Sequence, residues 1–183
     1  MSESNHLGNS GLERIYLTTK DTATLVGCTL RQLQYWRKRS IVVPVVNPIG
    51  TGYSAYYDQK NVIDLFIINY LVTRGYDLKI AGQILWEIKE IGINYIDEEA
   101  KPILVYWDEI LQKFSIQEYS EELFKEFTKN QKIFNDIFSL VLIPINVFHK
   151  KFEKIMEVVK NRQEPKSANG SNIISNIPKI IIE

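Results

Sequence analysis

The sequence predicts an α+β protein, and two patterns carry this prediction. The first is a pair of short helical segments between residues 16 and 40, interrupted at Gly27. The second is a set of β-prone runs, which follow these helices directly and return after residue 102. We therefore expect a helical N-terminal domain with a strand hairpin over residues 12–92, and a small α+β domain over residues 93–160.

Each of the two short helices begins with a capping signal. Thr18 is followed three residues later by Asp21, and Thr29 is followed by Gln32, which is the spacing of a capping box. Gly27 lies where the first helix must stop, because glycine adopts the left-handed conformation at little steric cost. Two short helices around a tight glycine turn form a helix-turn-helix, whose second helix can enter the major groove of DNA.

Charge is distributed unevenly along the chain, although the formal net charge is zero. Residues 12–60 hold seven basic and three acidic residues, a net charge of +4. Residues 84–130 hold eleven acidic residues and five lysines, a net charge of −6. A positive surface is expected of a protein that binds a polyanion, so we expect only the first part of the chain to contact DNA.

A wing is expected after the second helix. The apolar run 41–46 and the aromatic run 53–57 flank a loop that contains Pro48 and Gly50. Two β-prone segments around such a loop predict a hairpin.

Together these features resemble the DNA-binding domain of MerR-type transcription regulators. The order and spacing of the motif residues agree over roughly 70 residues, and each piece alone would be weak evidence. The matching residues are Thr18, Ala23, Gly27, Leu33, Tyr35, Trp36, Ile41, Pro44, Gly52, Tyr53, Tyr56, Gly75, Tyr76, Leu78, Ala81 and Gly82. The chain departs from the family pattern at Gln34, Arg37, Ser40 and Ser54, where the family has arginine, glutamate, glycine and arginine.

The resemblance implies that Tyr35 contacts the phosphate backbone, while Trp36 packs inside. It gives Tyr53 and Tyr56 a partial role in phosphate contact, with core packing as the alternative for Tyr53. For Thr29 and Gln32 the alternative to reading bases is capping of the second helix. The candidate DNA-binding residues are Thr18, Thr29, Arg31, Gln32, Gln34, Tyr35, Arg37, Lys38, Arg39, Tyr53, Tyr56 and Lys60.

Two longer helices should complete the first domain. Asp58 can cap a helix that runs to about Arg74 and ends at Gly75. Asp77 can cap a helix over residues 78–91, which Gly92 ends. Residues 1–11 are polar and contain glycine, so we expect a disordered leader.

After Gly92 the pattern changes, since Asn94 and Pro102 interrupt the long dimerisation helix that the resemblance would place here. We expect strands over 103–107 and 110–116, a helix over 119–129, a strand over 139–147 and a helix over 148–160. A single helix over 102–114 is the alternative to the first two strands. Residues 161–183 are expected to be a linker and a tail, which could add an edge strand to a sheet.

No catalytic residue, cofactor or metal site is predicted. Cys28 is the single cysteine, and we expect a packed thiol there rather than a redox switch. His6 and His149 are isolated from other metal-ligating residues. The aromatic residues around Trp107 could line a ligand pocket, but a core or dimer cluster is the simpler interpretation, so we expect no small-molecule effector.

These features and the resemblance predict a homodimer that binds double-stranded DNA and represses transcription, with residues 93–160 holding the dimer together. The interrupted helix after Gly92 also resembles MerR-type repressors encoded beside mobile elements, including CRISPR-associated transposons. A DNA-architectural or recombination accessory factor and a ligand-gated activator are the alternatives. No apolar run is long enough to span a membrane and no signal peptide is evident, so we expect a cytoplasmic protein associated with the bacterial nucleoid.

Overall fold

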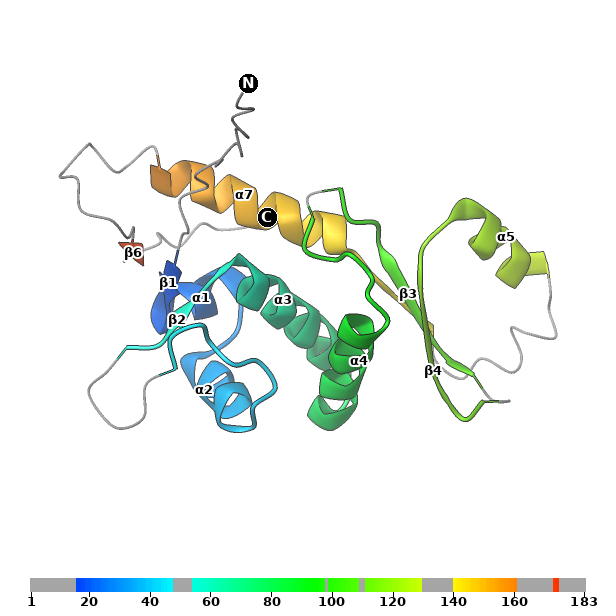
Figure 1. Ribbon diagram of the computed structural model, residues 1–183, viewed down its shortest axis with the longest axis horizontal. Coiled ribbons are helices and arrows are strands. Elements are labelled where there is room, and N and C mark those ends of the chain that lie inside the picture. Colours follow the sequence, from blue (N-terminus) through cyan, green and yellow to red (C-terminus); the bar gives the residue numbers. More distant parts are fainter. Residues whose placement is uncertain are drawn as a thin grey trace, which may run out of the picture.

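The structure, a computed structural model, describes residues 16–47, 54–97, 99–108, 111–129, 140–160 and 173–174 (Figure 1). The elements in the first part of the chain are β1 (Tyr16–Thr18), α1 (Thr19–Val26), α2 (Leu30–Lys38), β2 (Tyr56–Tyr57), α3 (Gln59–Thr73) and α4 (Leu78–Glu90). Those in the second part are β3 (Ile103–Asp108), β4 (Lys113–Glu118), α5 (Glu121–Lys129), β5 (Leu140–Ile143), α7 (Ile145–Lys160) and β6 (Ile173–Ile174). The predicted α+β class is confirmed.

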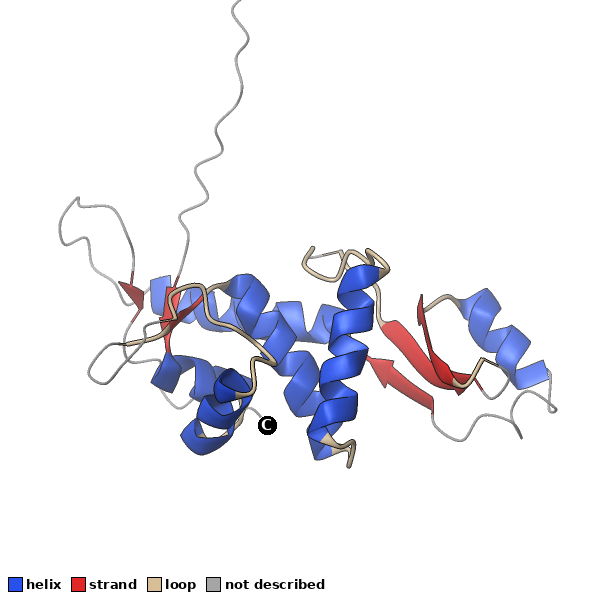
Figure 2. Ribbon diagram, turned by 60° about the horizontal axis from the view of Figure 1, so that its bottom comes forward, coloured by secondary structure: helices blue, strands red, loops and turns tan. Residues whose placement is uncertain are grey.

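The strands form two small sheets at opposite ends of the helices (Figures 1 and 2). One sheet has the order β2-β1-β6, and the other has the order β4-β3-β5. In the second sheet β3 pairs with both neighbours in antiparallel fashion, with Val105 opposite Ile116 on one side and Val141 on the other. The predicted strands, rather than the alternative helix over 102–114, are therefore present.

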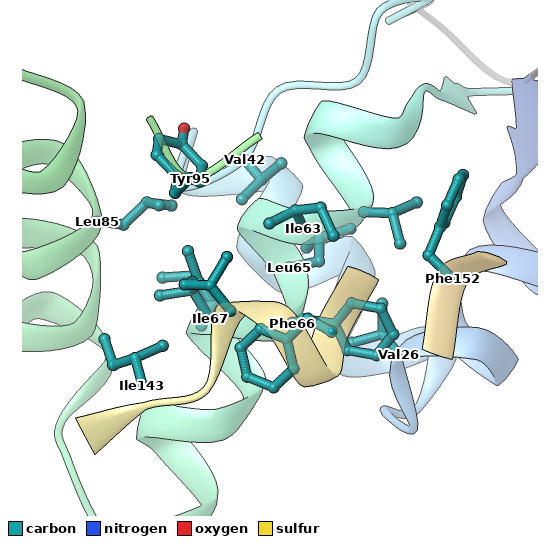
Figure 3. Packing of buried hydrophobic residues seen from close by; sticks show 14 of the residues in the cluster. Val26, Val42, Ile63, Leu65, Phe66, Ile67, Leu85, Tyr95, Ile143 and Phe152 are labelled. Carbon is teal, nitrogen blue, oxygen red and sulfur yellow. The ribbon is translucent and has the colours of Figure 1, made fainter. Parts of the chain in front are cut away.

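α3 lies at the centre of the molecule, because it has apolar residues on every side. All residues from Asn61 to Ile68 are buried, and six of these eight residues are apolar; Asn61 and Asp64 are the two polar ones. A helix that is hydrophobic all round must be surrounded by other elements. α1, α4, α7 and β2 all pack against it, and Figure 3 shows Val26, Leu85 and Phe152 from three of these helices around α3.

The segment after Gly92 packs back onto α3. Phe148 of α7 stacks on Phe66 at 5.3 Å between ring centroids and meets Tyr70 edge-on at 5.6 Å. The Tyr70 hydroxyl donates a hydrogen bond to the Leu142 carbonyl of β5 at 2.7 Å. Buried residues on both sides of Gly92 thus belong to one hydrophobic cluster. The division of the chain at residue 92 stays a prediction.

The wing differs from the prediction, since residues 41–46 form no strand. Val46 makes a single antiparallel bridge with Tyr56, with N···O distances of 3.1 and 3.2 Å. On its other side Tyr56, together with Tyr57, pairs with β1. The loop over residues 48–53 lies outside the described part of the chain.

Asn61 of α3 gives the physical reason. Its Oδ1 accepts a hydrogen bond from the Val45 amide at 3.0 Å, and its Nδ2 donates to the Val43 carbonyl at 3.1 Å. Pro44 lies between these two residues and has no amide hydrogen to give to a sheet. Because a side chain satisfies these backbone groups, the segment needs no strand partner.

Several boundaries in the second part also differ from those predicted. β5 ends at Ile143 and α7 begins at Ile145, because the Pro144 carbonyl accepts the amides of Val147 and Phe148 and so starts the helix earlier. β4 begins at Lys113 instead of residue 110, since Asp108 accepts the Leu111 amide in the turn.

β6 adds to β1 in parallel, so part of the tail does provide an edge strand.

Asp64 is a carboxylate inside the core. Its Oδ2 accepts a hydrogen bond from Lys89 Nζ at 2.6 Å, and its Oδ1 accepts one from the Tyr95 hydroxyl at 2.9 Å. One side chain therefore links α3, α4 and the segment after α4. Burial raises the pKa of Asp64 above its ordinary value of 3.8, although Lys89 and Tyr95 both favour the ionised form.

The raised pKa predicts a specific pH dependence of stability. The folded chain holds the Asp64 proton more tightly than the unfolded chain, so protonation contributes stability that is fully present below the unfolded pKa of about 4. This contribution is lost as the pH rises through the folded pKa. Urea titrations should show that the unfolding free energy of the unmodified chain, relative to Asp64→Asn, decreases as the pH is raised from acid toward neutral. A difference that is constant or increases with pH would contradict the raised pKa.

Candidate nucleic-acid interface

α1 and α2 form a helix-turn-helix with both predicted caps in place. The Thr18 hydroxyl oxygen accepts the Asp21 amide at 3.3 Å at the start of α1. Gly27 ends α1 with φ of 80°, in the left-handed conformation that was expected. At the start of α2, Thr29 and Gln32 form a complete capping box, with hydrogen bonds of 2.8 and 3.1 Å between side chains and backbone.

α2 is held to the protein by one side only. Leu33 and Trp36 are the buried residues of this helix, whereas Tyr35 is 47% exposed. Trp36 therefore packs inside, as the resemblance implied. In Figure 1 α2 lies on the opposite side of α3 from α7, so its outer face is turned away from the rest of the chain.

The outer face of α2 is basic and polar. Arg31, Gln34, Lys38 and Arg39 are all exposed. The Arg39 guanidinium carbon lies 5.3 Å from the centroid of the Tyr35 ring, at a distance typical of a cation–π contact. Lys20 on α1 and Lys60 at the start of α3 are exposed as well, so basic side chains are also accessible outside α2.

Several candidate residues are engaged within the protein. Thr29 and Gln32 cap α2, which favours the capping alternative for them, and Thr18 caps α1. Arg37 is half-buried, and its Nε donates to Asn47 Oδ1 at 2.6 Å, so it connects α2 to the wing segment. Tyr56 is half-buried in β2, and Tyr53 lies outside the described residues.

Residues 17–87 match the family described as MerR HTH family regulatory protein. The match runs from β1 to α4 and includes every element of the helix-turn-helix just described. This part of the chain is a MerR-type helix-turn-helix domain. A search of curated proteins found no match. The match indicates a regulatory domain of the DNA-binding helix-turn-helix type.

Two asparagines of α3, which sequence reasoning missed, set the geometry of the MerR-type domain. Asn61 holds the segment after α2, as described above, and its own amide donates to the Asp58 cap at 2.8 Å. Asn69 Nδ2 donates to the Val26 carbonyl at 3.1 Å and so fixes the end of α1. Both asparagines fall within an apolar helix, and a polar residue in such a helix is the signal that could have identified them.

Two further residues considered as functional candidates, Cys28 and His149, are partly or fully buried. Cys28 is half-buried against the core, and burial raises the pKa of its thiol to about 11, so the thiol is protonated at neutral pH. His149 is buried, with Nε2 at 3.0 Å from the Tyr95 carbonyl oxygen. Among the residues that the structure describes, no group of three metal-ligating side chains occurs. Within the same ranges no helix is long and apolar enough to cross a membrane.

Ser40 stands where the resemblance to MerR-type regulators places a glycine, and its backbone conformation is one that favours glycine. Ser40 has φ of 54°, which is left-handed. Its amide donates to the Arg37 carbonyl at 2.9 Å, and the Ile41 amide donates to the Trp36 carbonyl at 3.0 Å. This is the hydrogen-bond pattern of a Schellman motif, which usually ends a helix with glycine. The serine therefore carries backbone strain.

Replacing Ser40 by glycine should stabilise the domain. The left-handed conformation costs a residue with a Cβ about 1–2 kcal/mol, and the greater freedom of glycine in the unfolded chain offsets about 0.4–1 kcal/mol of this. We expect Ser40→Gly to raise the unfolding free energy by about 0.5–1 kcal/mol in denaturant titrations. Gly27→Ala is the matched reverse change at another left-handed position and should lower it. A Ser40→Gly chain no more stable than the unmodified one would show that Ser40 is unstrained.

Proposed function

We propose that the chain is a homodimeric repressor that places α2 of each subunit in the major groove of a two-fold-related operator. The observation that carries this proposal is the orientation of α2 in the MerR-type domain. Leu33 and Trp36 hold its inner side, and the outer side presents Arg31, Gln34 and Lys38 to solvent. These are side chains that hydrogen-bond base edges or phosphates in DNA complexes.

The exposed basic and polar residues are expected to make two kinds of contact with DNA, according to their positions on the helix. Arg31 and Gln34 lie in the N-terminal half of α2, the half of a recognition helix that meets base edges. Lys38, Arg39 and Tyr35 lie further along the helix or on its flank, where phosphate contacts are expected. Lys20 and Lys60 extend the positive surface along the DNA backbone. Arg37 acts indirectly, because its hydrogen bond to Asn47 positions the wing segment beside α2.

In this proposal, binding of the dimer to its operator is sufficient to repress transcription. A dimer bound over a promoter excludes the polymerase, and this requires no bound effector. One helix-turn-helix makes too few contacts for tight and specific binding, whereas two copies on a two-fold-related site double the contacts at one operator. The DNA sites are then expected to lie about one helical turn apart.

Charge reversal on α2 tests the proposal. DNA fragments recovered with the protein from its host cells are titrated with the full chain, and binding is followed by fluorescence anisotropy at several salt concentrations. Arg31→Glu should weaken binding by about 1–3 kcal/mol and unequally across operator variants, because it removes a base contact. Lys38→Glu should weaken binding to all variants alike and lower the salt dependence by about one counterion.

The matched control is Lys154→Glu, which reverses an exposed charge on α7, away from α2 in Figure 1. It should bind as tightly as the unmodified chain. If the combined Arg31→Glu and Lys38→Glu chain binds as tightly as this control, α2 is not the recognition helix. If operator occupancy leaves transcription unchanged in a reconstituted assay, the chain is not a repressor, and an architectural role is favoured.

A further inference from the structure

A shallow apolar groove runs between α4 and β4. Its volume is about 440 Å³. One wall is formed by Trp86 and Ile91 at the C-terminal end of α4, and the other by Leu111, just before β4, and residues 113–117 of β4. The half-buried side chains of Phe114 and Ile116 also line it, and Trp107 packs edge-on against Phe114 at 5.1 Å.

The groove gathers the most exposed large apolar side chains of the described part of the chain. Trp86 is 60% exposed, Leu111 is 56% exposed and Ile91 is 53% exposed. These residues come from two elements separated in sequence, so folding brings them together on one surface. Contiguous apolar surface of this kind, with a polar rim, marks an interaction site in soluble proteins. Tryptophan in particular is enriched among the residues that anchor interfaces.

Charges at the rim indicate what covers the groove. Glu87 and Glu90 line the α4 wall, and Lys113 lines the β4 wall. Neither Glu90 nor Lys113 forms an ion pair within the described residues. A two-fold axis places the same surface of two subunits against each other, so that α4 of one copy lies beside β4 of the other. Such a surface is self-complementary here, because the acidic wall of each copy then meets the basic residue of the other.

We propose that this groove is the dimer interface and that a second copy of the chain occupies it, with Trp86 of each subunit inserted against β4 of the other. This inference rests on the proposed function, since it names the surface that joins the two DNA-binding subunits. α4 is the last helix of the MerR-type domain and ends at Glu90, so it cannot extend into a long dimerisation helix. An interface on α4 holds the two copies of α2 at a fixed separation, as a two-fold operator requires.

A charge-swap experiment with full-length chains tests contact between subunits. Glu90→Lys alone and Lys113→Glu alone each bring like charges together in their own homodimers, and both should sediment mainly as monomers at micromolar concentration. When the two variants are mixed, one subunit carries two lysines and the other two glutamates at these positions. Dimers should then return in the mixture. If neither variant weakens the dimer, or if mixing fails to restore it, the interface lies elsewhere.

Truncation of the Trp86 side chain, with measurement of the dimer dissociation constant, is a second test. Trp86→Ala should raise the dimer dissociation constant by about tenfold or more, the loss typical of an anchoring tryptophan. The matched control is Phe124→Ala on α5, which removes an aromatic ring that is also exposed but lies outside the groove. It should leave the dissociation constant unchanged. Equal effects of the two substitutions would overturn the inference.

The outcomes separate this inference from the proposed function. If the chain dimerises through Trp86 but binds no DNA, the proposed interface is retained and the proposed repressor function is wrong. If the unmodified chain binds its operator and the Trp86→Ala chain remains dimeric, the DNA-binding function is retained and the proposed interface is wrong. An unmodified chain that is monomeric at micromolar concentration also overturns the interface.

Discussion

The rest of the structure depends on α3, a helix with no polar face. Burying apolar surface on every side of a helix is possible only when other elements surround it, and each buried large aliphatic side chain contributes about 1.5–3 kcal/mol. α1, α4 and α7 supply the cover, with β2 at one end. Three polar side chains on α3 each have a specific partner. Asp64 binds Lys89 and Tyr95, Asn61 binds the wing segment, and Asn69 binds the end of α1. The direction in which each neighbouring element leaves α3 is thereby fixed by hydrogen bonds as well as by packing.

This arrangement connects the buried helix to the proposed DNA-binding surface. α1 is fixed at its end by Asn69, and the glycine turn at Gly27 then sets the direction of α2. Leu33 and Trp36 hold α2 against the core, which leaves its basic face outward. On the other side of α3, Phe148 and Tyr70 bring α7 and β5 against the same helix. A change in packing around α3 would therefore reach both the DNA-binding face and the second sheet. In this sense the MerR-type domain and the segment after Gly92 share one core.

Local signals in the sequence predicted most of the helices correctly, since a cap or a stop depends on residues three or four positions apart. Thr18, Thr29, Asp58 and Asp77 all cap the helices expected of them, and Gly27, Gly75 and Gly92 all adopt positive φ. The errors arose where a distant residue decided the local structure. The strand expected over residues 41–46 is absent because Asn61, many residues away, satisfies its backbone groups. Likewise the groove between α4 and β4 was not foreseen, because exposure of Trp86 and Leu111 is set by tertiary packing and not by their sequence neighbours. The candidate DNA-binding residues follow from family resemblance and from the exposed side of α2, and their contacts stay predictions.

The central claim is that two copies of α2, related by a two-fold axis, recognise DNA together. Selection from a pool of random duplexes by the full chain, followed by sequencing of the bound fraction, tests it most directly. The account predicts enriched sequences that contain two inverted copies of one short motif, with centres about 10–10.5 base pairs apart or a multiple of that spacing. Enrichment of a single motif without an inverted copy, or no enrichment over the starting pool, would contradict it.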